Sequence, residues 1–129
     1  MSKRFLLDTQ VLAWLVVDRK RIGKEAMRFI ERNEIYFSTP SIAELSFKRT
    51  QGKFNYSISL VDAWREAGFT LLNFDLGAAN AFGRFSPEWV PDPFDRQIMA
   101  VAAANNLTLI TSDRKILSQG FDWVLDATT

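Results

Sequence analysis

The chain has 129 residues, 47% hydrophobic and 24% charged, and this composition predicts a single globular domain spanning residues 1–129. It contains neither cysteine nor histidine, which excludes disulfides, thiolate or imidazole metal ligands and catalysis by a histidine base. No apolar run is long enough to cross a membrane, and Asp8 comes too early for a secretory signal, so a cytoplasmic location is expected.

Short apolar runs alternate with helix-like patterns along the chain. In order, we expect a strand at 4–7, helices at 9–17 and 23–32, a strand at 35–38, helices at 41–49 and 59–67, a strand at 70–74, helices at 76–85 and 93–106, a strand at 107–111, a helix at 114–119 and a strand at 123–125. This alternation predicts an α/β fold in three layers, with a central parallel sheet of four to five strands covered by helices on both faces.

Three details of the helices are also expected. In the third helix, the apolar residues Ile42, Leu45 and Phe47 are expected to face the core. Ser59 should open the next helix as the first residue of a Ser-x-x-Asp pattern that approximates a capping box. Pro93 should lie in the first turn of the long helix, where its missing N–H does no harm.

The net charge of the chain is only +1, but its charges are unevenly distributed. Residues 1–53 contain 11 Lys and Arg against 6 Asp and Glu, whereas residues 54–129 contain 5 against 9. A basic half of this kind suits binding to a polyanion, although basic runs are also common on solvated helix faces.

Four carboxylates are expected at one edge of the sheet. Asp8 directly follows the first strand and Asp113 follows the fourth, so both lie where parallel strands end. Glu44 lies one turn into the helix after the second strand, and Asp95 lies in the first turn of the long helix. Carboxylates that crowd one site cannot all stay ionised unless a cation joins them, and without it at least one pKa should be raised. Oxygen ligands favour Mg²⁺ or Mn²⁺ over Zn²⁺.

Each of these carboxylates also has a structural explanation. Asp8, Asp92 and Asp113 are suited to cap the helices that follow them. Glu44 lies four residues before Lys48, and the two can form an ion pair along a helix. The arrival of four acidic groups at one edge is what favours a functional site over separate structural roles.

Four segments resemble, in order, the successive motifs of PIN domains, and most closely those of short bacterial VapC-type toxins. They read Leu-Leu-Asp-Thr at 6–9, Ser-Ile-Ala-Glu-Leu at 41–45, Asp-Pro-Phe-Asp-Arg at 92–96 and Thr-Ser-Asp at 111–113. The resemblance covers nearly the whole chain, and the segment at 92–96 is its most specific part. It places Asp8, Glu44, Asp95 and Asp113 on the family's metal-binding acidic quartet, with Asp92 on an additional acidic position.

This resemblance implies an endoribonuclease dependent on Mg²⁺ or Mn²⁺, the toxin of a toxin–antitoxin pair, which hydrolyses RNA phosphodiesters at the quartet. It also implies a small antitoxin partner and a homodimer. Thr9 and Thr111 could support the carboxylates by hydrogen bonds. Lys48, Arg49 and Arg96 lie near the quartet in sequence and are candidates for RNA binding, because an acidic site repels phosphates without nearby cations.

The chain departs from the family pattern at two positions. Relatives often have a histidine where Gln10 stands, and another just before the motif at 92–96, where Val90 and Pro91 stand. These differences leave open a catalytically weak or inactive PIN-like module that binds RNA or a protein partner, which a test of metal-dependent RNA cleavage would separate from the enzyme. A phosphotransfer protein with Asp8 as covalent acceptor fits less well, because such proteins carry a second acidic residue in that segment.

Overall fold

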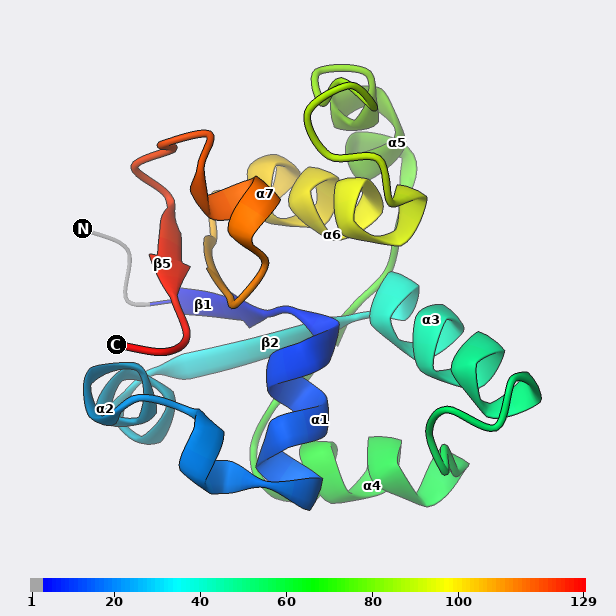
Figure 1. Ribbon diagram of the computed structural model, residues 1–129, viewed down its shortest axis with the longest axis vertical. Helices are drawn as coiled ribbons and strands as arrows, with labels where there is room; N and C mark the ends of the chain where they lie inside the picture. Colours follow the sequence, from blue (N-terminus) through cyan, green and yellow to red (C-terminus); the bar gives the residue numbers. More distant parts are fainter. Residues whose placement is uncertain (1–3) are drawn as a thin grey trace.

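The computed structural model describes residues 4–129, which form a five-stranded sheet with helices on both faces (Figure 1). Every strand pair is parallel, and the strand order is β3-β2-β1-β4-β5. The strands are β1 (Arg4–Leu7), β2 (Glu34–Ser38), β3 (Thr70–Leu72), β4 (Thr108–Thr111) and β5 (Val124–Asp126). The predicted three-layer α/β/α architecture is confirmed, with five strands in its sheet.

The helices divide between the two faces of the sheet. They are α1 (Thr9–Val17), α2 (Lys24–Arg32), α3 (Thr39–Thr50), α4 (Ile58–Glu66), α5 (Leu76–Phe82), α6 (Pro93–Ala104) and α7 (Arg114–Leu117), with a 3₁₀ turn, η1 (Arg19–Arg21), that the sequence pattern did not predict. In Figure 1, α1, α2 and α4 lie below the sheet, whereas α5, α6 and α7 lie above it. None of the helices in residues 4–129 has the length and apolar character required to cross a membrane.

The central strand β1 serves both hydrophobic cores. Its side chains alternate, so that Phe5 and Leu7 pack into the core with α1, α2 and α4, and Leu6 packs into the core with α5, α6 and α7. None of the three side chains is more than 2% exposed. Because the strand is buried on both faces, it consists of consecutive apolar residues rather than alternating apolar and polar ones.

The order of the strands reverses next to β1. The chain runs from β1 outward through β2 to β3, and then returns to place β4 and β5 on the other side of β1. Asp8 follows β1, and its backbone N–H donates to the Ile110 carbonyl of β4 at 3.0 Å. Ligands of such sheets bind outside the carboxyl ends of the strands at this switch point, which is where Asp8 and Asp113 lie.

Several elements end earlier than predicted. The strand expected at 70–74 ends at Leu72, the helix expected at 76–85 ends at Phe82, and the long helix ends at Ala104. The predicted cap of α4 is wrong, because the Ser57 hydroxyl accepts the Ser59 backbone N–H at 3.2 Å and Ser59 already lies within the helix.

The prediction that Phe47 faces the core is also wrong. Its side chain is 52% exposed, whereas Leu45 is buried as expected. The buried side of α3 also carries the polar residues Ser41 and Glu44, because this side faces the start of α1 and the pocket described below. Phe47 instead lies beside α6, with its ring centroid 6.3 Å from that of Phe94.

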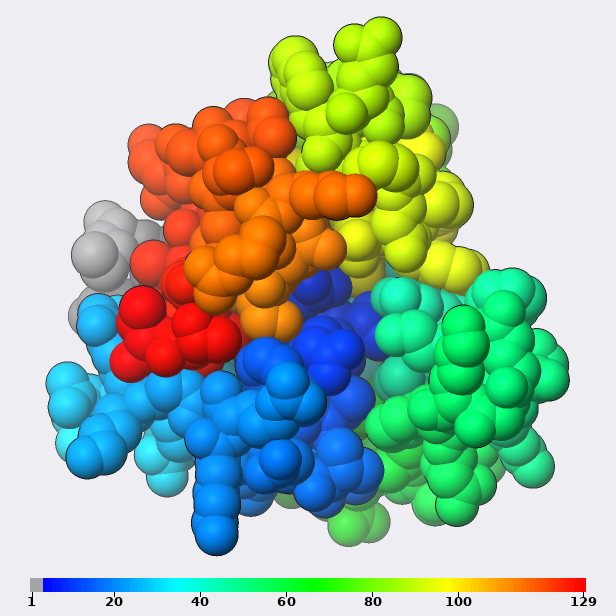
Figure 2. Space-filling model, in the orientation of Figure 1, coloured from blue at the N-terminus to red at the C-terminus, as the bar shows by residue number. Residues whose placement is uncertain are grey.

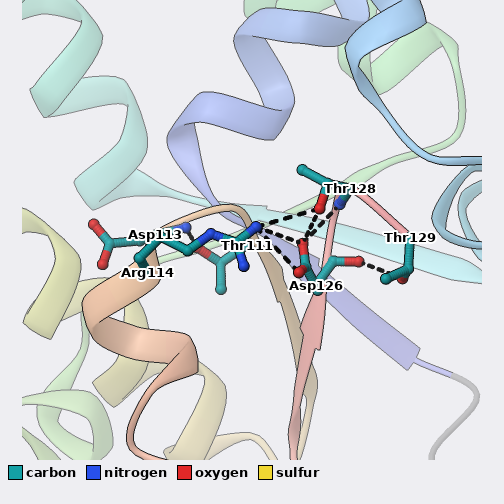
Figure 3. A network of polar contacts seen from close by, with 6 residues as sticks. All are labelled: Thr111, Asp113, Arg114, Asp126, Thr128 and Thr129. Carbon is teal, nitrogen blue, oxygen red and sulfur yellow. Dashed lines mark hydrogen bonds and ion pairs between the residues drawn. The ribbon is translucent and has the colours of Figure 1, made fainter.

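The residues after β5 join two helices to the sheet. The Asp126 carboxylate accepts the backbone N–H and the hydroxyl of Thr128 at 2.8 and 2.6 Å, and its other oxygen forms an ion pair with Arg114 at 3.1 Å (Figure 3). On the other side, the Gly23 N–H donates to the Ala127 carbonyl at 2.9 Å. These contacts attach Arg114, the first residue of α7, and Gly23, which precedes α2, to the segment after β5.

Candidate active site

A pocket of about 200 Å³ lies at the carboxyl edge of the sheet. Figure 2 shows the hollow in which the start of α1, in blue, meets α3 in teal, α6 in yellow and α7 in orange. The walls of this acidic pocket are Asp8, Thr9, Gln10, Glu44, Lys48, Asp92, Asp95, Ser112 and Asp113. The structure therefore brings all four carboxylates of the predicted quartet, and Asp92, to one place.

Asp8 is the most deeply buried carboxylate of the acidic pocket, with 3% of its surface exposed. It caps α1, because its Oδ1 accepts the Thr9 backbone N–H at 2.8 Å. Its Oδ2 accepts the Thr111 hydroxyl at 2.5 Å, which ties the end of β1 to the end of β4. Each oxygen retains a further lone pair for another partner.

Thr111 links two of the carboxylate residues through one hydroxyl group. Its hydroxyl donates to Asp8, and its oxygen accepts the backbone N–H of Asp113 at 3.1 Å. Asp113 in turn caps α7, since its Oδ1 accepts the N–H groups of Lys115 at 2.8 Å and Ile116 at 3.0 Å. The capping roles expected of Asp8 and Asp113 are therefore real, and they hold both carboxylates at the pocket.

Glu44 reaches the pocket from the buried side of α3. Its Oε2 lies 3.5 Å from the Lys48 ammonium, whereas its Oε1 is buried and has no hydrogen-bond partner in the described part of the chain. A buried carboxylate oxygen without a partner is costly in free energy. A cation bound in the pocket would provide the missing partner.

The first turn of α6 adds two more carboxylates. Asp92 caps this helix, because its Oδ1 accepts the N–H groups of Phe94 and Asp95 at 2.7 and 3.4 Å. Glu44, Asp92 and Asp95 each offer one carboxylate oxygen, and these three oxygens lie within 4.8 Å of one another. Oxygen ligands at this separation suit a cation such as Mg²⁺ or Ca²⁺.

Comparison with known proteins identifies the family. The family model of the PIN domain matches residues 5–121. This chain belongs to the PIN-domain family. Among curated protein sequences, none matches the chain significantly.

Solved structures share the fold of this PIN domain. VapBC2 from Rickettsia felis, bound to a DNA fragment from its promoter, contains a chain with 17% identity and a TM-score of 0.68, and the match covers 95% of this chain and 96% of that one. A toxin–antitoxin complex from Klebsiella pneumoniae contains a chain with 21% identity and a TM-score of 0.67, and the match covers 95% of this chain and 96% of that one. VapBC-1 from nontypeable Haemophilus influenzae contains a chain with 20% identity and a TM-score of 0.69, and the match covers 98% of this chain and 99% of that one. At these identities the likeness shows a common fold.

Two carboxylates of the acidic pocket have a raised pKa. The pKa of Asp8 is raised to about 6, mainly by burial, which outweighs its two hydrogen bonds. The pKa of Asp95 is raised to about 8, first by burial and then by the negative charges of the other carboxylates in the acidic pocket. Without a cation, Asp95 therefore retains a proton at neutral pH.

The donor set of the PIN domain fits a hard divalent cation. All of its charged donors are carboxylate oxygens, and one Glu44 oxygen is buried with no partner among residues 4–129. The pKa of Asp95 is held high by burial and by neighbouring negative charge. A cation would neutralise this charge and release the proton from Asp95, so metal binding should be tighter at higher pH.

The predicted supporting residues are divided between the pocket and other roles. Thr9 lines the pocket, and its buried hydroxyl donates to the Ser41 hydroxyl at 2.9 Å, which joins α1 to α3. Lys48 also lines the pocket. Within residues 4–129, neither Arg49 nor Arg96 forms part of its wall, and the Arg96 guanidinium lies over the Phe82 ring at 5.1 Å.

Three residues of the site were not found by sequence reasoning. Gln10 and Ser112 line the acidic pocket, and their closeness in sequence to Asp8 (two residues before Gln10) and Asp113 (directly after Ser112) could have indicated this. Ser41 carries no such signal, because its bond to Thr9 depends on how α1 packs against α3.

Metal-free protein is expected to be more stable at about pH 5 than at about pH 8. Asp8 and Asp95 have pKa values of about 6 and about 8 when folded, above the ordinary value of 3.8. The folded state therefore binds more protons than the unfolded state in this window, and the free energy of unfolding falls as the pH rises through it. Thermal scans in EDTA at both pH values measure this difference.

The same scans test the cation. Millimolar Mg²⁺ or Mn²⁺ should raise the melting temperature, and more so at the higher pH, because the ion binds only the native state and competes with protons. Melting temperatures that change with neither pH nor divalent ion would contradict the coupling of these carboxylates to a metal site.

Proposed function

We propose that this chain is a VapC-type toxin, an endoribonuclease dependent on Mg²⁺ or Mn²⁺ that hydrolyses RNA phosphodiesters at the acidic pocket. The observation that supports this most directly is the convergence of four carboxylates from four separate elements in one pocket, where one oxygen of Glu44 is buried with no partner in the described part of the chain. The PIN-domain match and the shared fold with chains of toxin–antitoxin complexes support the same proposal.

Glu44, Asp92 and Asp95 are the residues proposed to hold the cation first, because their oxygens lie within 4.8 Å of one another. Asp8 and Asp113 complete the set as ligands of the same or a second ion, directly or through water. A bound divalent ion lowers the pKa of a coordinated water and neutralises charge on phosphate oxygens.

Residues in and beside the pocket position these carboxylates and balance their charge. The Thr111 hydroxyl orients Asp8 and, through the Asp113 backbone, the start of α7. Lys48 lies at 3.5 Å from Glu44 and partly balances the negative charge near the phosphate. Asp95 holds a proton in the metal-free pocket and gives it up when a cation binds.

RNA as substrate, a small antitoxin as partner and a homodimer are part of the same proposal. One similar structure is described as a toxin–antitoxin complex from Klebsiella pneumoniae, and another as a member of the VapBC family of toxin–antitoxin systems from Mycobacterium tuberculosis. The basic N-terminal half of the chain supplies charge suited to RNA, with 11 Lys and Arg against 6 Asp and Glu in residues 1–53.

Cleavage of single-stranded RNA is the experiment that tests this function. Purified protein should cut a panel of unstructured RNAs with Mg²⁺ or Mn²⁺, and EDTA should stop the reaction, because the carboxylates alone supply neither the activated water nor charge neutralisation. Cleavage that persists in EDTA would show that the metal-dependent mechanism is wrong. An inert wild-type protein that still binds RNA would instead favour the non-catalytic PIN-like module, which Gln10 in the pocket wall already suggests.

A further inference from the structure

The acidic pocket continues into a hollow on each of two sides. On one side, a hollow of about 300 Å³ along α1 and α3 shares Thr9, Gln10 and Lys48 with the pocket. On the other side, a hollow of about 640 Å³ beside the starts of α6 and α7 shares Asp92, Asp95 and Asp113. Each hollow shares three wall residues with the acidic pocket, and the two hollows share none of these residues with each other. The two hollows and the pocket therefore form one continuous track with the carboxylates in its middle.

The hollow along α1 and α3 is basic and partly aromatic. Its walls include Arg21, Lys48 and Lys53 against the single acid Asp18, together with the half-buried ring of Phe54. The Arg21 guanidinium lies over the Trp14 ring at 4.8 Å, and Lys48 is paired with Glu44. Within residues 4–129, no ion pair involves the ammonium group of Lys53, so this charge is available to a ligand.

The hollow beside α7 has its own cation. Arg114 and Lys115 both line it. Figure 3 shows the Arg114 side chain extending towards Asp126 and Thr128, on the other side from the Asp113 carboxylate, and the ion pair with Asp126 measures 3.1 Å. Lys115 is exposed, and no ion pair in the described residues involves its ammonium group. Lys115 is therefore the available charge on this side.

We infer that this track holds a single strand of RNA, with one phosphate bound by Lys53 on one side of the acidic pocket and another bound by Lys115 on the opposite side. The inference rests on the proposed function and adds the path of its substrate. Five carboxylates in the middle of the track repel a phosphodiester chain, so cations on both sides are needed to hold it across them. A positive groove with an aromatic ring such as Phe54 suits unpaired bases, which can stack on it.

A track that is open on both sides also defines how the substrate is cut. A strand that enters beside Lys53 leaves beside Lys115, so no chain end has to reach the carboxylates. Cleavage is therefore internal, and a circular single-stranded RNA is expected to be a substrate.

Binding of RNA by lysine variants tests the track without catalysis. Fluorescence anisotropy with a labelled, unstructured 16-nucleotide RNA in EDTA should show several-fold weaker binding for Lys53→Gln and for Lys115→Gln. Each substitution should make the negative slope of the logarithm of the RNA-binding constant against the logarithm of the salt concentration shallower by about 0.7, which corresponds to one lost phosphate contact. The double variant should make it shallower by about twice as much. Lys24→Gln is the matched control, because Lys24 is exposed and lines none of the three hollows, and it should bind like wild type.

The outcomes separate this inference from the proposed function. Wild-type affinity and salt slope in either Lys53→Gln or Lys115→Gln would overturn the two-sided track, as would the absence of RNA binding by wild type. Equal or tighter binding of an RNA duplex would overturn the single strand as occupant. If Mg²⁺-dependent cleavage is present but neither lysine variant binds RNA more weakly than wild type, the nuclease proposal stands and the track is wrong. If the lysine effects are found but no RNA is cleaved, the track stands and the nuclease proposal fails.

Discussion

Asp113→Asn and Asp8→Asn proteins are expected to stay folded and to cleave RNA at least ~100-fold more slowly than wild type. Removing one carboxylate charge weakens the hold on the divalent cation, and a loss of this size corresponds to roughly 3 kcal/mol of transition-state stabilisation. The asparagine carbonyl can still cap the helix that follows, because Asn is as good an N-cap as Asp. Cleavage rates with saturating Mg²⁺ and melting temperatures measure the two effects separately.

Of the two variants, Asp113→Asn disturbs the hydrogen bonds of the folded protein less. Both hydrogen bonds that Asp113 accepts go to Oδ1, so an amide oxygen can replace it without loss. Asp8 accepts through both oxygens, and in Asp8→Asn the Thr111 hydroxyl has to rotate to meet an amide nitrogen. Asp62→Asn is the matched control, because Asp62 is exposed on α4, and it should cleave like wild type. Normal cleavage by folded Asp113→Asn would remove this residue from the catalytic site.

Gly23→Ala is expected to destabilise the protein by about 1–3 kcal/mol. The backbone of Gly23 has an ordinary φ of −66°, so the requirement for glycine is one of space. An added Cβ would meet the carbonyl carbon of Thr129 and would lie 2.5 Å from that of Thr128. The segment after β5 would have to move, which breaks the bonds from Gly23 to the Ala127 carbonyl and from the Glu25 N–H to the Thr129 carbonyl, at 2.9 and 3.1 Å.

Thermal or urea denaturation measures this loss, which should lower the melting temperature by several degrees. Gly83→Ala is the matched control. Gly83 has a helical backbone with φ −66° at the end of α5, and an added Cβ there meets nothing within 4 Å. Its stability should stay within about 0.5 kcal/mol of wild type. Equal stability of both variants would show that the segment after β5 contributes little to folding.

The sequence predicted best where a local signal and the tertiary fold agree. The bounds of β1 and α1 are confirmed, because a fully apolar run is followed by Asp8, a residue that both ends the strand and caps the helix. The same agreement between local sequence and fold explains why the location of the acidic pocket was predicted correctly. Asp8 and Asp113 each follow a strand directly or closely, so knowing that the sheet is parallel was enough to place both at one edge.

The features that sequence reasoning missed depend on packing between elements. Phe47 was expected inside, but it lies only two residues after the buried Leu45, and side chains two residues apart do not share a helix face. The buried side of α3 carries Glu44 instead, although burial of a charge is usually unfavourable. Arg96 is adjacent to Asp95 in sequence, yet it extends over Phe82, because successive side chains on a helix point in different directions. Neither outcome follows from residue type alone.

The central position of β1 has a consequence for the chain during its synthesis. β1 is made first, but one of its two neighbours, β4, is made roughly a hundred residues later. Until then the growing chain has an open, apolar strand edge, which is a template for aggregation. Thr111 and Asp113 are also still missing, so the Asp8 carboxylate has neither its hydroxyl partner nor its acidic neighbour. A product that stops short of β4 therefore cannot assemble the acidic pocket, which becomes complete only after nearly the whole chain has emerged.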